Sequence, residues 1–206
     1  MGDPTYGPKI YFDEGGNRLT AKDGASIVIE AGASLQLPGD RMKGFIPLAL
    51  ADAREVAANA TINAAGNGGL LASDTTPIFE RVNGATDKQL RLNWAAANVD
   101  ELTWQFAYPP DLDDGQDVTV HCLAAMAGAT DTPTLAIGYF EGVGDTDAGG
   151  ATAALSNTLA EVSRAIAAAD IGAHPKVATV SLTPGAHGTD ALYVYAAWVE
   201  YTRKSV

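Results

Sequence analysis

The chain has 206 residues, enough for one sizeable domain with an appendage or for two small domains. Lys and Arg total 13 against 25 Asp and Glu, and the net charge of −12 argues against nucleic acid or an anionic membrane as a partner. The single cysteine, Cys122, excludes a disulfide within the chain, and no apolar stretch reaches membrane-spanning length. The first ten residues contain no apolar run, so we expect no secretion signal and synthesis in a cytoplasm.

A short repeat dominates the N-terminal part. Three glycines recur at intervals of eight, and each is followed three positions later by an apolar residue: Gly16, Leu19, Gly24, Ile27, Gly32 and Leu35. This pattern indicates a turn followed by a strand, with glycine supplying the turn. A self-contained β-helix coil needs about 18 residues, so one eight-residue unit cannot enclose a core. The repeat therefore favours a homotrimeric shaft over residues 1–39, in which each chain supplies one side; an ordinary β-meander is the alternative.

The rest of the chain, residues 40–206, has the period-two pattern of half-buried strands. Apolar and polar or small residues alternate over 90–94, 102–106, 118–122, 135–139 and 178–182. Pro, Gly or Asp stands in each gap, which is typical of an antiparallel β-sandwich or jelly roll. Aromatic residues make up only 7% of the chain, so a few large side chains must form the core. The residues expected there are Trp94, Trp104, Phe106, Tyr139, Phe140 and Trp198.

Residues 155–169 are ambiguous, because their apolar residues fit a helical stripe and their alanines favour a helix. In an otherwise all-β chain we favour a strand over 159–166 with a helical turn after it.

The last strand is apolar or aromatic on both faces. Strict alternation places Leu192, Val194, Ala196 and Trp198 on one face and Tyr193, Tyr195, Ala197, Val199 and Tyr201 on the other. Both faces should therefore be covered. One should meet the domain's own core, and the other a second sheet of the same chain or a neighbouring subunit. Tyr193, Tyr195 and Tyr201 are the candidate subunit interface.

Groups suited to catalysis are scarce. Ser181, His187 and Asp190 are the types needed for a nucleophile, a base and an acid, but no nucleophile elbow surrounds them. There is no phosphate-binding glycine loop and no Cys/His set with zinc spacing. We therefore expect no enzyme, no catalytic residues, no cofactor and no metal.

Two acidic loops deserve separate consideration, since dense carboxylates can bind calcium. The first contains Asp111, Asp113, Asp114 and Asp117, and the second Glu141, Asp145 and Asp147. The first loop departs from the EF-hand pattern at Gly115 and Cys122. We expect solvated turns whose aspartates bond to their own backbone, with calcium binding as the alternative.

Two groups of segments resemble virion proteins of tailed bacteriophages. The first is KIYF at 9–12, GNRLT at 16–20 and the Gly-Ala-Ser repeats, which resemble the N-terminal region of these proteins. The second resembles their C-terminal domain and comprises residues 86–94, 109–112, 131–133 and 182–201. The resemblance covers nearly the whole chain, and its motifs are fold-forming rather than catalytic.

The resemblance implies a structural protein on the outer surface of the phage head. The particular role it implies is a trimeric decoration, or cement, protein whose partner is the major capsid protein. The alternative is a carbohydrate- or receptor-binding module of a tail fibre or spike, since one fold serves both roles. A binding module should expose aromatic side chains on a concave face. The apparently buried positions of the aromatics therefore favour the assembly role.

Overall fold

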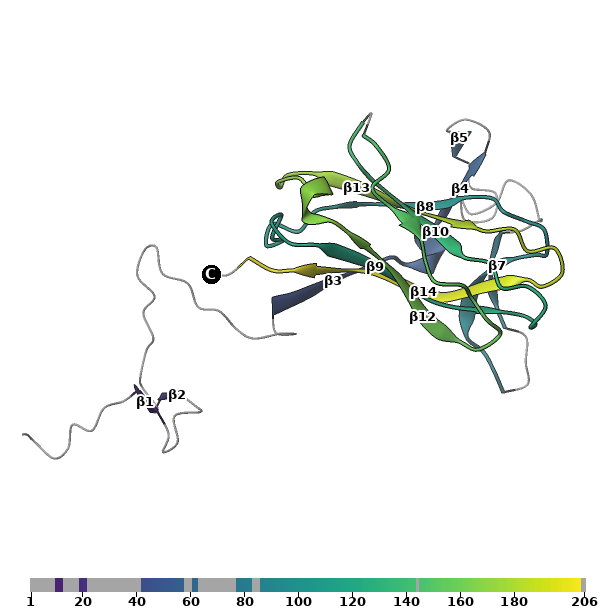
Figure 1. Cartoon of the computed structure of the whole chain (residues 1–206), viewed down its shortest axis with the longest axis horizontal. Helices are drawn as coiled ribbons and strands as arrows, with labels where there is room; N and C mark the ends of the chain where they lie inside the picture. The colour runs from purple at the N-terminus through teal and green to yellow at the C-terminus, as the bar shows by residue number, and fades with distance from the viewer. Residues whose placement is uncertain are drawn as a thin grey trace, which may run out of the picture. The chain divides into compact units, whose positions relative to one another are not determined.

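The computed structural model describes residues 10–12, 19–21, 42–57, 61–62, 77–82, 86–143 and 145–204 (Figure 1). The chain divides into two units: Met1–Leu37 together with 205–206, and Pro38–Lys204. Within the part of the chain that the structure describes, no helix is both long and apolar enough to cross a membrane.

The first unit contains a short antiparallel pair. Strand β1 (Ile10–Phe12) pairs with β2 (Leu19–Ala21), so Leu19 lies opposite Phe12. The other residues of the predicted shaft, Gly16, Gly24, Ile27, Gly32 and Leu35, lie outside the described residues. The trimeric shaft stays a prediction.

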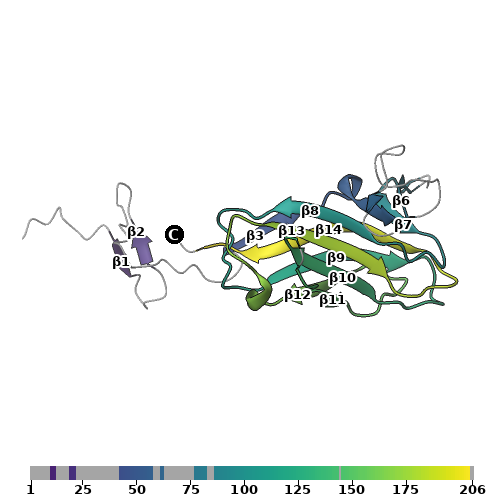
Figure 2. The same cartoon turned by 90° about the horizontal axis from the view of Figure 1, so that it is seen from above.

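The second unit is an all-β sandwich of two antiparallel sheets, which confirms the predicted fold class (Figures 1 and 2). Sheet I has the order β11-β10-β13-β8-β4-β5 and sheet II the order β12-β9-β14-β7-β6, with β3 also paired to β14. The strands of sheet I are β4 (Arg54–Ala57), β5 (Thr61–Ile62), β8 (Leu102–Ala107), β10 (Leu135–Glu141), β11 (Gly150–Ala151) and β13 (Val177–Pro184). Those of sheet II are β3 (Lys43–Pro47), β6 (Ile78–Arg81), β7 (Leu90–Trp94), β9 (Val118–Met126), β12 (Ala160–Ile166) and β14 (Leu192–Thr202).

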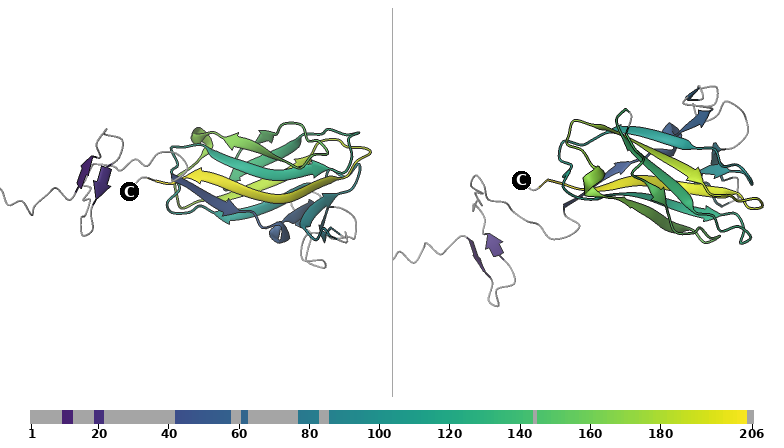
Figure 3. Two further views of the ribbon diagram at one scale, coloured as in Figure 1. Left: turned by 90° about the horizontal axis from the view of Figure 1, so that it is seen from below. Right: turned by 45° about the horizontal axis from the view of Figure 1, so that its top comes forward.

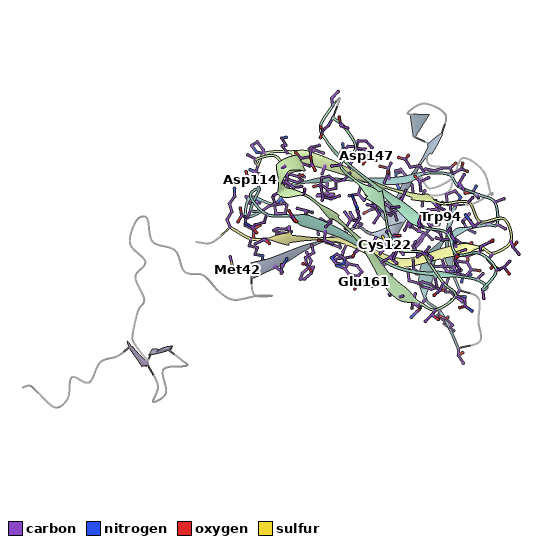
Figure 4. The ribbon with its side chains drawn as sticks, viewed as in Figure 1. Met42, Trp94, Asp114, Cys122, Asp147 and Glu161 are labelled. Carbon is purple, nitrogen blue, oxygen red and sulfur yellow. The ribbon has the colours of Figure 1, made fainter. Side chains whose placement is uncertain are left out.

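The core lies between the two sheets and follows the predicted alternation. Trp94, Trp104 and Tyr139 are buried, and the two indole N–H groups donate to the carbonyls of Asp100 (2.9 Å) and Ala49 (2.8 Å). These bonds remove the cost of burying an unpaired indole donor. Figure 4 labels Trp94 within the sandwich.

Some predicted core residues behave differently. Phe106 is partly buried against the core, as expected of a residue at its margin. Phe140 and Trp198 are partly exposed on outer sheet faces, so their assignment to the core was wrong. Cys122 is fully buried, as its apolar segment indicated, and burial raises the pKa of its thiol to about 12.

The ambiguous segment is a strand followed by a helical turn, as predicted. Strand β12 pairs with β9, and the 3-10 helix η3 (Ala168–Asp170) follows it. Val162 and Ile166 are buried on the core side. The tertiary pairing with β9 therefore overrides the helix propensity of the alanines.

Two loops brace each other through reciprocal carboxylate bonds. Asp131 Oδ2 accepts the backbone N–H groups of Thr189 (2.7 Å) and Asp190 (2.8 Å). Asp190 Oδ2 in turn accepts those of Thr130 (2.7 Å) and Asp131 (3.0 Å). The bonds from Asp190 and Thr189 lower the pKa of the Asp131 carboxyl.

Candidate functional site

A β-bulge in β14 determines which aromatic side chains face outward. Val194 pairs with Ala124 and Ala196 with Leu123, which leaves Tyr195 as an extra residue between them. One extra residue reverses the alternation of everything after it. The predicted faces are therefore wrong from Ala196 onward, and Trp198 lies on the outer face of sheet II.

On the inner face, the bulge places Tyr201 in the core. Tyr201 is 5% exposed, its ring lies over Gly44 of β3, and its hydroxyl donates to Asp111 Oδ1 at 3.1 Å. Burial, with the bond to Asp111, raises the pKa of Tyr201. Tyr201 was therefore wrongly placed in the outward subunit interface, whereas a subunit-contact role for Tyr193 and Tyr195 stays a prediction.

Figure 3 (left) looks onto sheet II, with β14 between β9 and β3. The described residues of the second unit form no third sheet over this face. Covering by a second sheet of the same chain, one of the two expectations for the last strand, is therefore not found within the described residues of this unit.

On the outer face, Arg91 of β7 contacts both Tyr193 and Tyr195 of β14. Its guanidinium carbon lies 3.6 Å from the ring centroid of Tyr193, and its Nη1 donates to the Tyr195 hydroxyl at 3.4 Å. Glu80 of β6 holds the same guanidinium through Nε at 2.8 Å. Burial opposes the charge, but the bonds with Tyr195 and Glu80 raise the pKa of Arg91 overall. Asn93 donates to Glu80 at 3.1 Å, and its buried Oδ1 has no hydrogen-bond partner among the described residues.

Further along β14, the outer face carries a stack of two rings, Trp198 and His121. Trp198 lies parallel to the His121 ring of β9, with centroids 5.0 Å apart and 1° between the planes. His121 Nδ1 is 2.7 Å from Glu161 Oε1 of β12, and Lys43 of β3 pairs with Glu200 at 2.9 Å. Figure 4 labels Glu161. The buried Nε2 of His121 has no hydrogen-bond partner in the described part of the chain, and Glu200 stands 4.0 Å away.

A groove of about 570 Å³ opens beside the bulge. Its walls come from β9, the segment before β12, β14, the β6–β7 pair and the 3-10 helix η2 (Leu50–Asp52). The lining residues are Ala49, Leu50, Ala51, Phe79, Gln89, Leu90, Leu123, Leu159 and Tyr195. None of these described lining residues is charged, and Gln89 and Tyr195 supply the polar side-chain atoms. Such a lining is typical of a small-molecule site.

A second hollow, of about 550 Å³, is acidic and includes Glu141, Asp145, Asp147, Asp170 and Lys176. The buried Glu141 carboxylate accepts the Gly172 N–H (2.8 Å), the Lys176 ammonium (2.8 Å) and the Tyr108 hydroxyl.

The carboxylates of the acidic loops bond to backbone, as predicted. Asp147 accepts the N–H groups of Tyr139 and Gly149, Asp145 accepts that of Glu141, and Asp113 accepts that of Gly115. Among the described residues, no group of three His, Cys, Asp or Glu side chains is arranged to hold a metal ion.

The three residues of catalytic type lie in β13 and in the loop that follows it. The His187 Nδ1 lies 2.8 Å from the Gly185 carbonyl, and the Asp190 carboxylate serves the loop brace described above. Ser181 lies in β13, beside Gly138 of β10. His187 Nε2 is buried and has no hydrogen-bond partner in the described part of the chain.

The sequence matches no protein-family model and no curated protein sequence. Among solved structures, the chain is similar to the paired carbohydrate-binding and catalytic modules of Clostridium thermocellum endo-1,4-β-D-xylanase 10B, complexed with xylohexaose. The identity is 15% and the TM-score 0.40, over 65% of this chain and 25% of that one. The chain thus spans about a quarter of that protein's length.

Two further solved structures share the likeness. TmCBM61 in complex with β-1,4-galactotriose has 10% identity and a TM-score of 0.40, over 79% of this chain and 88% of that one. The enzymatically active domain of bacteriophage CBA120 tailspike protein 4 has 10% identity and a TM-score of 0.33, over 61% of this chain and 17% of that one. The likeness to TmCBM61 is one of fold, the β-sandwich.

Sequence reasoning missed the outer face because it assumed unbroken alternation in the last strand. One signal was present: the alternation over 90–94 and 118–122 puts Arg91, Asn93 and His121 opposite the apolar residues of their strands. Polar groups that converge beside a strand with surplus aromatics mark a candidate binding face.

Proposed function

We propose that this protein is a non-catalytic carbohydrate-binding module whose binding surface is the outer face of sheet II. The observation that carries the proposal is the aromatic row of β14, Tyr193, Tyr195 and Trp198, flanked by fixed polar side chains. Aromatic rings offer apolar faces to the C–H side of a sugar, and hydroxyl, amide and charged groups can bond its hydroxyls.

The polar groups on this face are held in place before any ligand arrives. Glu80 fixes both Arg91 and Asn93, and Glu161 fixes His121. Asn93 Oδ1 and His121 Nε2 are without partners in the described part of the chain, and an unpaired buried polar atom costs about 1–3 kcal/mol. Side chains fixed in advance lose little entropy on binding.

The biological setting follows from the resemblance to phage virion proteins. A carbohydrate-binding module in a tail fibre or spike contacts glycans of the host surface, which is the setting we propose. If the N-terminal repeat joins three chains, three such faces act together. Avidity then strengthens binding by about 10²–10⁴-fold over one face.

The test is a glycan array probed with the full chain, followed by calorimetry on the best glycan. Tyr195→Ala and Trp198→Ala should each weaken binding at least about tenfold, because both rings belong to the aromatic row. Phe140→Ala is the matched control, since Phe140 is a partly exposed aromatic on the other sheet. It should bind as the unmodified chain does. Absence of binding across the array, or equal losses in all three variants, would contradict the proposal.

The second candidate is a trimeric head decoration protein that binds the major capsid protein. Phe45 favours it: this side chain is 59% exposed on β3, and one edge of β3 has no partner strand among the described residues. An exposed aromatic at an open strand edge suits a contact with another subunit. Particles lacking the protein should then assemble but rupture more readily on heating. Intact particles that lose only adsorption to the host would favour the carbohydrate-binding reading.

A further inference from the structure

The groove beside the bulge differs in chemistry from the surface around Tyr193 and Trp198. It carries apolar walls, while the charged side chains stand around Tyr193 and Trp198. We propose that this groove takes the acetamido group of an N-acetylhexosamine, an inference that rests on the carbohydrate-binding function. The sugar ring lies against the aromatic row, and the acetyl methyl enters the groove.

The first argument for this proposal is the apolar lining of the groove. Leu123 and Leu159 stand on neighbouring segments of the outer face, and Leu159 is 45% exposed. Leu90, at the β7 side of the groove, is 52% exposed. A plain hexose presents only hydroxyls at its rim and would leave these apolar walls without a matching group. An acetyl methyl can cover them, and removing apolar surface from water is favourable.

The second argument is that the polar side chains of the groove match the hydrogen-bonding groups of an acetamido group. The Tyr195 oxygen accepts from Arg91, which leaves the Tyr195 O–H to donate. The Gln89 side chain also lines the groove and contains both a carbonyl acceptor and an amide donor. An acetamido group has one N–H and one C=O beside its methyl, so Tyr195 can donate to its carbonyl while Gln89 accepts its N–H.

The third argument is the absence of charge from the described lining of the groove. The groove lining has no charged member among the described residues, and Arg91 is paired with Glu80 at 2.8 Å. The whole chain has a net charge of −12, which repels uronic and sialic acids. The groove therefore suits a neutral sugar whose recognition element is an amide with a methyl group.

The experiment titrates the full chain with four methyl glycosides, followed by NMR. They are the glucoside, the galactoside and the 2-acetamido counterpart of each, so each pair differs in one substituent. At least one acetamido sugar should bind about tenfold more tightly than its parent, the size expected for a small group entering an apolar pocket. Saturation transfer to that sugar should be strongest at the acetyl methyl.

Variants separate the groove from the rest of the face. Leu159→Asn should remove the preference, so that the acetamido sugar and its parent bind with equal affinity. Tyr195→Phe should reduce the same preference. Val177→Asn is the matched control, because Val177 is an apolar residue 42% exposed on sheet I. It should change neither affinity.

The outcomes distinguish this inference from the proposed function. Equal binding of parent and acetamido sugars, lost equally in Trp198→Ala, would overturn the acetamido inference and keep the carbohydrate-binding function. A preference that survives Leu159→Asn would also overturn the inference. Failure of all four sugars and of the glycan array would overturn both.

Discussion

The two hollows of the sandwich have nearly the same volume, about 550 and 570 Å³, and opposite chemistry. In the acidic hollow, Glu141 is bonded by Gly172, Lys176 and Tyr108. On the outer face of sheet II, outside the lining of the apolar groove, Asn93 and His121 each have a buried atom without a hydrogen-bond partner in the described part of the chain. Volume alone does not mark a binding site. Polar groups already bonded to their own chain stabilise the fold, whereas a buried polar atom without a partner costs folding free energy.

The substitution expected to have the largest effect on stability is Glu141→Gln. An amide cannot accept from the Gly172 N–H, Lys176 and Tyr108 together, and it removes a charge that is bonded while buried. We expect the free energy of unfolding to fall by about 3 kcal/mol in urea titrations, with carbohydrate binding unchanged. Glu161→Gln is the control, since the Glu161 side chain is 53% exposed and its charge should contribute less than about 1 kcal/mol. Equal losses in the two variants would mean that the acidic hollow is not structural.

Two tyrosines of β14 allow a bonded side chain of the core to be compared with one on the outer face. Tyr201→Phe deletes a partly buried bond to Asp111 and should cost about 1 kcal/mol of stability, measured by urea unfolding. Tyr195→Phe deletes a hydroxyl on the outer face and should cost less than about 0.5 kcal/mol. If Tyr195→Phe lost more stability than Tyr201→Phe, the hydroxyl that stabilises the fold would be that of Tyr195. That result would contradict the assignment of the two tyrosines to the outer and inner faces.

The loop brace at Asp131 extends the comparison to pH. Its pKa is lowered in the folded protein, so its stabilising effect is complete above the unfolded value, about 4, and is lost as the pH falls through the folded value. Asp131→Asn should therefore lower Tm at neutral pH, and the gap to the unmodified protein should close below about pH 4. Thermal melts of both proteins across this range measure the gap. A gap that stays constant into strong acid would rule out the carboxylate as its cause.

Local pattern was enough to predict most of the sandwich, because each of the strands β7, β8, β9, β10 and β13 alternates over its own few residues. It also predicted β12 and the helical turn after it. The faces of β14 could not be predicted, because the extra residue at Tyr195 leaves no trace in composition. The groove was also out of reach: its walls at Ala49, Phe79, Leu123 and Leu159 meet only through tertiary packing.

The most direct test of a carbohydrate face on sheet II is a backbone amide titration by NMR, with methyl 2-acetamido-2-deoxy-β-D-glucopyranoside and its galacto counterpart as probes. The account predicts saturable shifts for the amides of Leu123, Ala196 and Trp198, which lie along the outer face. The Gly172 amide, which donates to Glu141 in the acidic hollow, should stay in place. Shifts confined to Gly172 and its neighbours, or no saturable shift at any amide, would contradict it.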